Sequence, residues 1–247
     1  MRSYRSSRSI PESVLARISA KANFNYNSQY ACLYRESDET GLTDWTHISW
    51  GERLREISAS FRRPIDVLDL GCGTGRYFHC LQNVQSLIGV DISKPMLSIA
   101  RNNPILQSEI KVEKIDLIHG DILRIDFPEQ SFDFVYSVGV LGDYAPLSLA
   151  LLERIWRWLK YGGSTFLTVM DSASPKGKSW KRSLATFLYP VLPHSIKVYV
   201  DIRIGDYTIN WCDFEALLRQ TRFTYFKIYR QVQRRTFLFT TAQKIGD

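Results

Sequence analysis

Short apolar runs alternate with amphipathic or glycine-rich segments through the middle of the chain. Five runs have the length of buried strands, and we predict strands at 65–70, 86–91, 115–118, 131–138 and 164–170. The remaining segments predict helices at 75–82, 95–101, 146–160 and 213–219, the third stopped by Gly162 and Gly163. Strands that alternate with helices predict a parallel sheet covered by helices on both faces.

The two ends of the chain depart from this alternation. Residues 11–22 and 44–60 predict helices ahead of the first strand. Residues 223–230 and 235–241 predict two final strands with no helix between them, so one should run antiparallel to the rest. The fold class is therefore α/β, with a seven-stranded, mostly parallel sheet, an antiparallel C-terminal strand and an N-terminal helical extension.

Three tyrosines lie between the first two predicted helices. Tyr26, Tyr30 and Tyr34 recur every four residues, which places them on one face of a helix. Packing in the core and contact with a ligand are equally open interpretations of this face.

Length and patterning predict one domain of 247 residues with four parts. These are a helical cap (1–60), a core (61–170), a lid (171–212), and a C-terminal helix and hairpin (213–247). The lid is predicted because the strand–helix rhythm breaks there, and long loops in compact domains often cover a site.

Charge and cysteine content limit the partners. The net charge of +7 permits an anionic partner, but the basic residues form no broad face with interleaved aromatics, so nucleic acid is not expected. The four cysteines lack metal-ligand spacing, which predicts reduced thiols, no metal site and a cytoplasmic location. No apolar run has the roughly 18–20 residues of a membrane span. A monomer and a homodimer both remain open, and the basic N-terminus is either a solvated tail or a targeting segment.

The stretch VLDLGCGTGRYF (67–78) carries the clearest chemical signal. Gly71, Gly73 and Gly75 alternate after a strand, which predicts a tight turn with exposed backbone against a ligand. A dinucleotide motif would have a third glycine where Arg76 stands. Asp69 would repel a pyrophosphate, but it suits a cation such as the amino group of S-adenosylmethionine (SAM).

The chain resembles the class I SAM-dependent methyltransferases. The resemblance rests on DLGCGTGR (69–76), GVDIS (89–93), GDI (120–122), FDFVYSVGVL (132–141) and LKYGGSTFLT (159–168). It implies a Rossmann-like fold, SAM as the cofactor and methyl transfer as the reaction.

The resemblance also implies a cofactor-binding set at the ends of the first four strands. A carboxylate at Asp91 would accept hydrogen bonds from both ribose hydroxyls, although a strand-end acid without a ligand is the alternative. Asp69 would lie against the methionine part, and Asp121 would accept from the adenine amino group. The implied set is Asp69, Gly71, Cys72, Gly73, Asp91, Ile92, Met96, Asp121, Ile122, Ser137 and Val138, with Gly139 as a further candidate.

The catalytic residues and the methyl acceptor are less well defined. Asp143 and Tyr144 follow the fourth strand and could bind or deprotonate a substrate, although Asp143 also suits a simple turn. His119, two residues before Asp121, is a third candidate, with a structural role as its alternative. The chain lacks the D/N-P-P-Y/F, cysteine–proline and paired-glutamate motifs of family members that modify nucleic acids or arginine.

A small-molecule acceptor, methylated at nitrogen, oxygen or carbon, is therefore our leading hypothesis. An RNA or protein methyltransferase and a nonenzymatic SAM-binding protein are the alternatives. Arg76 and Asp69 disfavour a nucleotide-dependent oxidoreductase.

Overall fold

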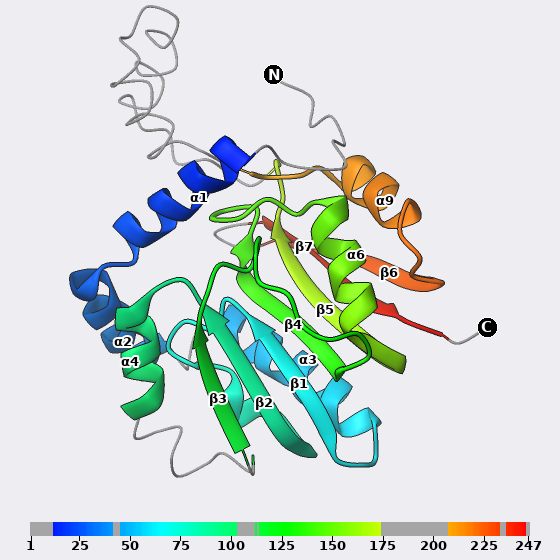
Figure 1. Ribbon diagram of the computed structural model, residues 1–247, viewed down its shortest axis with the longest axis horizontal. Helices are drawn as coiled ribbons and strands as arrows, with labels where there is room; N and C mark the ends of the chain where they lie inside the picture. Colours follow the sequence, from blue (N-terminus) through cyan, green and yellow to red (C-terminus); the bar gives the residue numbers. More distant parts are fainter. Residues whose placement is uncertain are drawn as a thin grey trace, which may run out of the picture.

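The computed structural model has a seven-stranded sheet at its centre (Figure 1). It describes residues 12–41, 45–102, 112, 114–173, 207–232 and 236–245. The strand order is β3-β2-β1-β4-β5-β7-β6, and β7 runs antiparallel to both β5 and β6. The predicted mostly parallel sheet with an antiparallel C-terminal strand is confirmed. The strands are β1 (Ile65–Leu70), β2 (Val84–Asp91), β3 (Lys114–His119), β4 (Phe132–Leu141), β5 (Leu159–Met170), β6 (Tyr225–Val232) and β7 (Thr236–Gln243).

Helices cover both faces of this sheet. Figure 1 shows α6 and α9 in front of the sheet and α3 behind it. The α-helices are α1 (Glu12–Asn25), α2 (Ser28–Gly41), α3 (Trp45–Ser60), α4 (Lys94–Asn102), α6 (Leu149–Trp158) and α9 (Trp211–Arg219). No helix among the described residues has both the length and the apolar character needed to cross a membrane.

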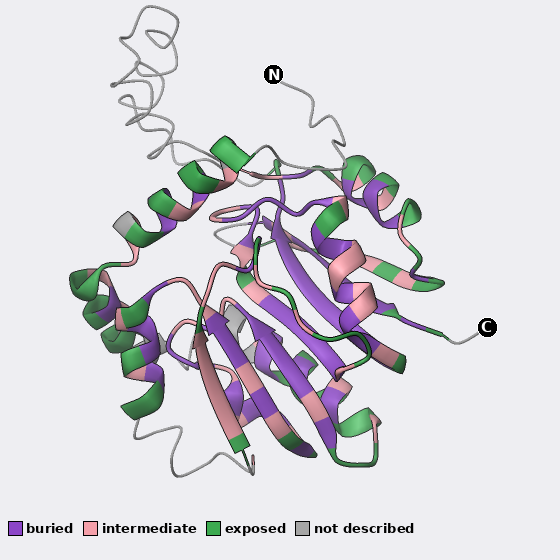
Figure 2. Ribbon diagram, viewed as in Figure 1, coloured by how far each residue is buried: buried purple, intermediate pink, exposed green. Residues whose placement is uncertain are grey.

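The central strands are buried on both faces, as near-continuous apolar runs require in a parallel sheet (Figure 2). Alternate residues of β1 enter two different apolar clusters. Leu68 and Leu70 pack with the buried residues of α6 and α9, whereas Val67 packs with Trp50 and Leu54 of α3. Apolar packing on both faces thus holds the strands of the sheet, and the residues at their ends, in place.

Helices α1 and α2 lie at the end of the sheet toward which β1, β2 and β4 point (Figure 1). The outer side of α1 is exposed (Figure 2), whereas Ile18 and Ala22 on its inner side are buried. The predicted tyrosine series is in contact, with ring centroids 5.2 Å apart for Tyr26–Tyr30 and 5.9 Å for Tyr30–Tyr34. Two helices of the N-terminal extension, α1 and α2, therefore border the sheet at its carboxyl edge.

Two predicted elements are wrong. Residues 75–82 form only the 3₁₀ turn η1 (Phe78–Cys80), because Gly75 has a φ of +75° and only a short connection remains before β2. Helix α6 ends at Trp158, and Leu159 already has extended dihedral angles. Gly162 and Gly163 therefore lie inside β5 and do not stop the helix.

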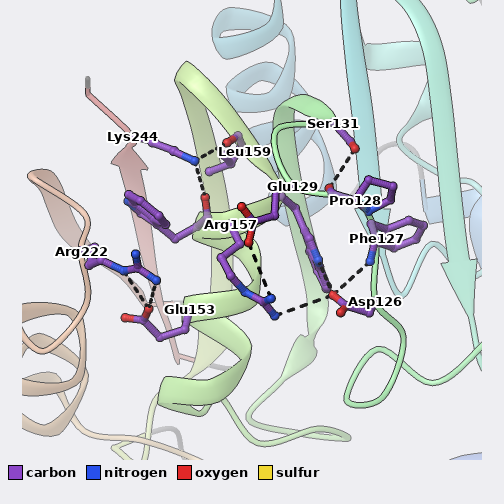
Figure 3. A network of polar contacts seen from close by, with 12 residues as sticks. Asp126, Phe127, Pro128, Glu129, Ser131, Glu153, Arg157, Leu159, Arg222 and Lys244 are labelled. Carbon is purple, nitrogen blue, oxygen red and sulfur yellow. Dashed lines mark hydrogen bonds and ion pairs between the residues drawn. The ribbon is translucent and has the colours of Figure 1, made fainter. Parts of the chain in front are cut away.

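Polar contacts join α6 to Lys244, the residue after β7, and to Arg222, between α9 and β6 (Figure 3). Lys244 donates to the carbonyls of Trp156 and Leu159 at 3.2 and 2.8 Å, which satisfies groups near the C-terminal end of α6. Glu153 of α6 forms an ion pair with Arg222 at 3.2 Å. Most of the predicted lid, residues 174–206, lies outside the described residues.

Candidate functional site

A cavity lies at the carboxyl ends of β1, β2 and β4, beneath α1 and the turn into α2. It encloses about 840 Å³ of space between protein atoms, its mouth included. Sheets of this kind bind ligands at this edge, where the strand order reverses on either side of β1 and β4.

The glycine loop forms one wall of the cavity. Gly71 has a φ of +85°, and a Cβ on it would lie 2.3 Å from Val140, so only glycine fits. A Cβ on Gly73 or Gly139, both with positive φ, would meet no protein atom within 4 Å. Since both line the cavity, a side chain at either position would take space from a ligand.

Asp91, the last residue of β2, is held by backbone donors. Its two carboxylate oxygens each accept a hydrogen bond at 2.8 Å, one from the N–H of Gly73 and the other from the N–H of Ser93. Burial raises the pKa of Asp91, and these two hydrogen bonds oppose the rise. The carboxylate is therefore fixed in orientation at the floor of the cavity.

Asp69 has a different electrostatic environment. It is 3% exposed at the cavity wall, and burial raises its pKa to about 8; the nearby Tyr136 partly opposes this rise, and the charge of Asp91 adds to it. A carboxylate in this state gains most from a cationic ligand group, which would favour its ionised form.

Asp121 connects the sheet edge to α1. One carboxylate oxygen accepts from the N–H of Leu123 at 2.8 Å, and the other accepts from the hydroxyl of Ser19. Because Ser19 and Asp121 are 102 positions apart, this contact holds α1 across the cavity.

The predicted cofactor residues gather at this cavity with one exception. Ser137 is fully buried, and its hydroxyl donates to the carbonyl of Leu70 at 2.7 Å, so it points into the sheet and not into the cavity. The others that line it are Asp69, Gly71, Cys72, Gly73, Asp91, Ile92, Met96, Asp121, Ile122, Val138 and Gly139.

The three catalytic candidates are separated. Tyr144 lines the cavity, with its ring centroid 4.6 Å from that of Tyr26, and burial raises its pKa. His119 is exposed, and its Nε2 lies 2.9 Å from the carbonyl oxygen of Ile92. Neither His119 nor the half-buried Asp143 is among the lining residues.

Sequence reasoning missed the part of the wall that comes from α1 and the end of the glycine loop. Ile18, Ser19 and Ala22 line the cavity, and so does Arg76. The apolar spacing of Ile18 and Ala22 marked a buried helix face, but no local pattern named its partner. Arg76 was noted only as a departure from a dinucleotide motif.

Comparison with known proteins agrees with this geometry. Residues 67–163 match the family model described as a methyltransferase domain. The demethylmenaquinone methyltransferase of Listeria monocytogenes is 26% identical over 151 residues, which cover 60% of this chain and 61% of that protein. The matched region thus spans about three-fifths of the length of that curated relative.

Two solved structures share the fold. The phosphoethanolamine N-methyltransferase 2 of Haemonchus contortus, in complex with S-adenosyl-L-methionine, has a TM-score of 0.64 at 18% identity, covering 96% of this chain and 62% of that one. The magnesium protoporphyrin IX methyltransferase of Synechocystis, with bound S-adenosylhomocysteine (SAH), has a TM-score of 0.61 at 14% identity, covering 91% and 99%. Together, the domain match over residues 67–163, the similarity to these methyltransferases and the shared fold support a class I SAM-dependent methyltransferase family for this chain.

Proposed function

We propose that this chain is an enzyme that transfers a methyl group from SAM to a nitrogen, oxygen or carbon atom of a small molecule. The observation that carries the proposal is one cavity in which Asp69, Asp91 and the glycine loop meet. The relatives support a small acceptor, since demethylmenaquinone, phosphoethanolamine and magnesium protoporphyrin IX appear in their names.

The residues of the cavity fit SAM in charge and in shape. Asp69 suits the amino group of the methionine part, because a buried carboxylate with a raised pKa is stabilised by a nearby cation. Asp91 offers oriented carboxylate oxygens to the ribose hydroxyls. Asp121, Ile122 and Met96 would hold the adenine, with the open space at Gly73 and Gly139 left for the ligand.

No α-helix follows the glycine loop within residues 71–83, all of which the structure describes. A bound pyrophosphate commonly sits on such a helix N-terminus, whereas SAM carries no phosphate. The 3₁₀ turn therefore favours SAM over a dinucleotide at this loop.

The chemistry asks mainly for alignment and exclusion of water. SAM supplies a methyl group on a cationic sulfur, which departs as a neutral thioether. The chain contributes by covering the cavity with α1 and by fixing its carboxylates, and alignment of this kind is worth several kcal/mol. Tyr144 stays a neutral hydroxyl because burial raises its pKa, so we assign it substrate positioning and not proton removal.

We also propose a cytoplasmic location and a monomeric or homodimeric state. The location is supported by four free cysteines, two buried and two exposed.

Titration calorimetry with SAM, SAH and NAD tests the proposal. We expect micromolar binding of SAM and SAH and no heat from NAD. A screen of small amines, phenols and acids for SAH release then tests turnover. Binding of NAD alone would contradict the cofactor, and SAM binding without turnover on any acceptor would favour a nonenzymatic SAM-binding protein.

A further inference from the structure

The cavity is lined by a positively charged residue as well as by its three aspartates. Arg76 is the only cationic side chain among the described residues that line it. This residue is 7% exposed, which is rare for arginine because a buried guanidinium loses its hydration. A buried cation on a cavity wall is a natural partner for an anion.

The position of Arg76 is set by the protein. Its guanidinium carbon lies 4.5 Å from the ring centroid of Tyr34, a cation–π distance. Gly75, with its φ of +75°, directly precedes Arg76 and sets the direction of the backbone there. A fixed arginine recognises planar oxyanions better than a mobile lysine does, because less side-chain entropy is lost on binding.

Aromatic rings also line the cavity. Tyr26 and Tyr144 lie with centroids 4.6 Å apart, and both line the cavity together with Tyr34. Burial raises the pKa of Tyr26 and Tyr144, so each presents an uncharged hydroxyl. Neutral hydroxyls and ring faces accept a flat ligand and do not repel a negative charge.

The charged residues that line the cavity suit two different kinds of ligand group. Asp69, Asp91 and Asp121 suit the cationic and hydroxyl groups of SAM, whereas Arg76 and the tyrosines lie outside that set. We propose that Arg76, Tyr34, Tyr26 and Tyr144 form the acceptor end, and that the acceptor is a flat molecule with an anionic oxygen group bound to Arg76. This inference rests on the proposed function.

A carboxylate could reach Arg76 from two sources, the acceptor or the methionine part of SAM. A matched pair of probes separates them: 3,4-dihydroxybenzoate and 3,4-dihydroxybenzamide, which differ in one negative charge. Each is titrated calorimetrically into SAH-saturated protein, and SAH is titrated separately. The variants are Arg76→Met, Arg76→Lys and the control Arg222→Met, whose guanidinium lies 4.1 Å from the Trp156 ring and does not line the cavity.

For the wild type and Arg222→Met we expect the benzoate to bind at least about 10-fold more tightly than the benzamide, as loss of a charged hydrogen bond predicts. Arg76→Met should abolish this preference, Arg76→Lys should keep part of it, and SAH affinity should change less than about 3-fold in both.

Three outcomes would overturn the inference. Equal binding of the two probes to the wild type, or binding of neither at millimolar concentration, would exclude an anionic aromatic acceptor. A loss of SAH affinity in Arg76→Met with the probe preference intact would assign Arg76 to the cofactor carboxylate. Failure of the wild type to bind SAH would instead contradict the proposed function itself.

Discussion

Two buried aspartates on neighbouring strands lie at opposite ends of the sheet. Asp133, near the start of β4, is 1% exposed and accepts from Arg63 at 2.6 Å, from Lys160 at 3.0 Å and from the N–H of Asp66 at 2.9 Å. Burial raises the pKa of Asp133, but these hydrogen bonds outweigh it and hold the pKa below its usual value. At this closed end Asp133 is thus paired with two cations, Arg63 and Lys160.

Asp69, at the other end of β1, is almost equally buried and has no cation among the groups that shift its pKa, which lies near 8. The two carboxylates thus differ in their partners and not in their burial. A buried acid paired by the fold stabilises the fold, whereas one that gains from an external cation marks a binding site.

The largest effect should come from replacing each aspartate by asparagine in the ligand-free protein. Because the folded-state pKa of Asp69 exceeds its unfolded value of about 3.9, ionising it removes stability as pH rises from about 4 to 8, by on the order of a few kcal/mol. Asp69→Asn should keep that stability at pH 9 and come close to the wild type at about pH 4, where little of it has been lost. Urea unfolding at both pH values measures this.

Asp133→Asn should behave oppositely. Its lowered pKa gives stability that is present above about pH 4 and is lost as pH falls through the folded-state pKa. The variant should lose roughly 1–3 kcal/mol at pH 7 and approach the wild type in acid. If the free energy of unfolding of Asp69→Asn equals that of the wild type at pH 9, the two aspartates do not differ as proposed.

The second effect concerns ligand affinity. Asp91→Ala should weaken SAM roughly 10- to 100-fold, since a charged hydrogen bond is worth about 1.5–3 kcal/mol and the Gly73 contact is also lost. Asp91→Asn, which keeps one acceptor oxygen, should lie between. Asp133→Asn is the matched control at the closed end and should bind SAM normally. Unchanged affinity in Asp91→Ala would mean that the ribose lies elsewhere.

The sequence predicted the acidic half of the cavity because strand ends are local features. Asp69, Asp91 and Asp121 each lie within two residues of the end of a recognisable strand, and parallel strands bring such ends to one edge. The side chain of Ser137 lies away from the cavity because one step along a pleated strand reverses the side chain, and Val138 lines the cavity instead.

The other half of the cavity depends on long-range contacts. No local pattern tells that Ser19 reaches Asp121, and the placement of Arg76 follows from a left-handed Gly75 that a helix prediction ignores. The sequence predicted the class of sheet but not which strands pair. The position of β7 between β5 and β6 is set by packing across the whole sheet.

The third effect compares two glycines. Gly139 and Gly162 both have positive φ, +77° and +80°, and a Cβ on either would meet no protein atom within 4 Å. Replacement by alanine should therefore destabilise both variants similarly, by about 1–2 kcal/mol. Only Gly139→Ala should weaken SAM, roughly 5- to 10-fold, because its methyl group enters the cavity. Calorimetry decides, and equal SAM affinity in the two variants would exclude Gly139 from the binding surface.

The smallest effect concerns two serines. Ser19 joins α1 to Asp121 across the cavity, while Ser58 of α3 accepts from the N–H of Gln82 at 2.9 Å beside the start of β2. Alanine at either position should lower the free energy of unfolding by about 0.5–1.5 kcal/mol.

Only Ser19→Ala should also change ligand exchange, because its hydrogen bond holds the helix that covers the cavity. We expect the dissociation rate of SAM to rise roughly 2- to 5-fold in stopped-flow experiments, which corresponds to about 0.4–1 kcal/mol at the cover. The association rate should rise with it, since the same helix opens for entry, so the equilibrium affinity stays close to that of the wild type. A change of the same size in Ser58→Ala would show that general loosening of the fold, and not the α1 contact, controls exchange.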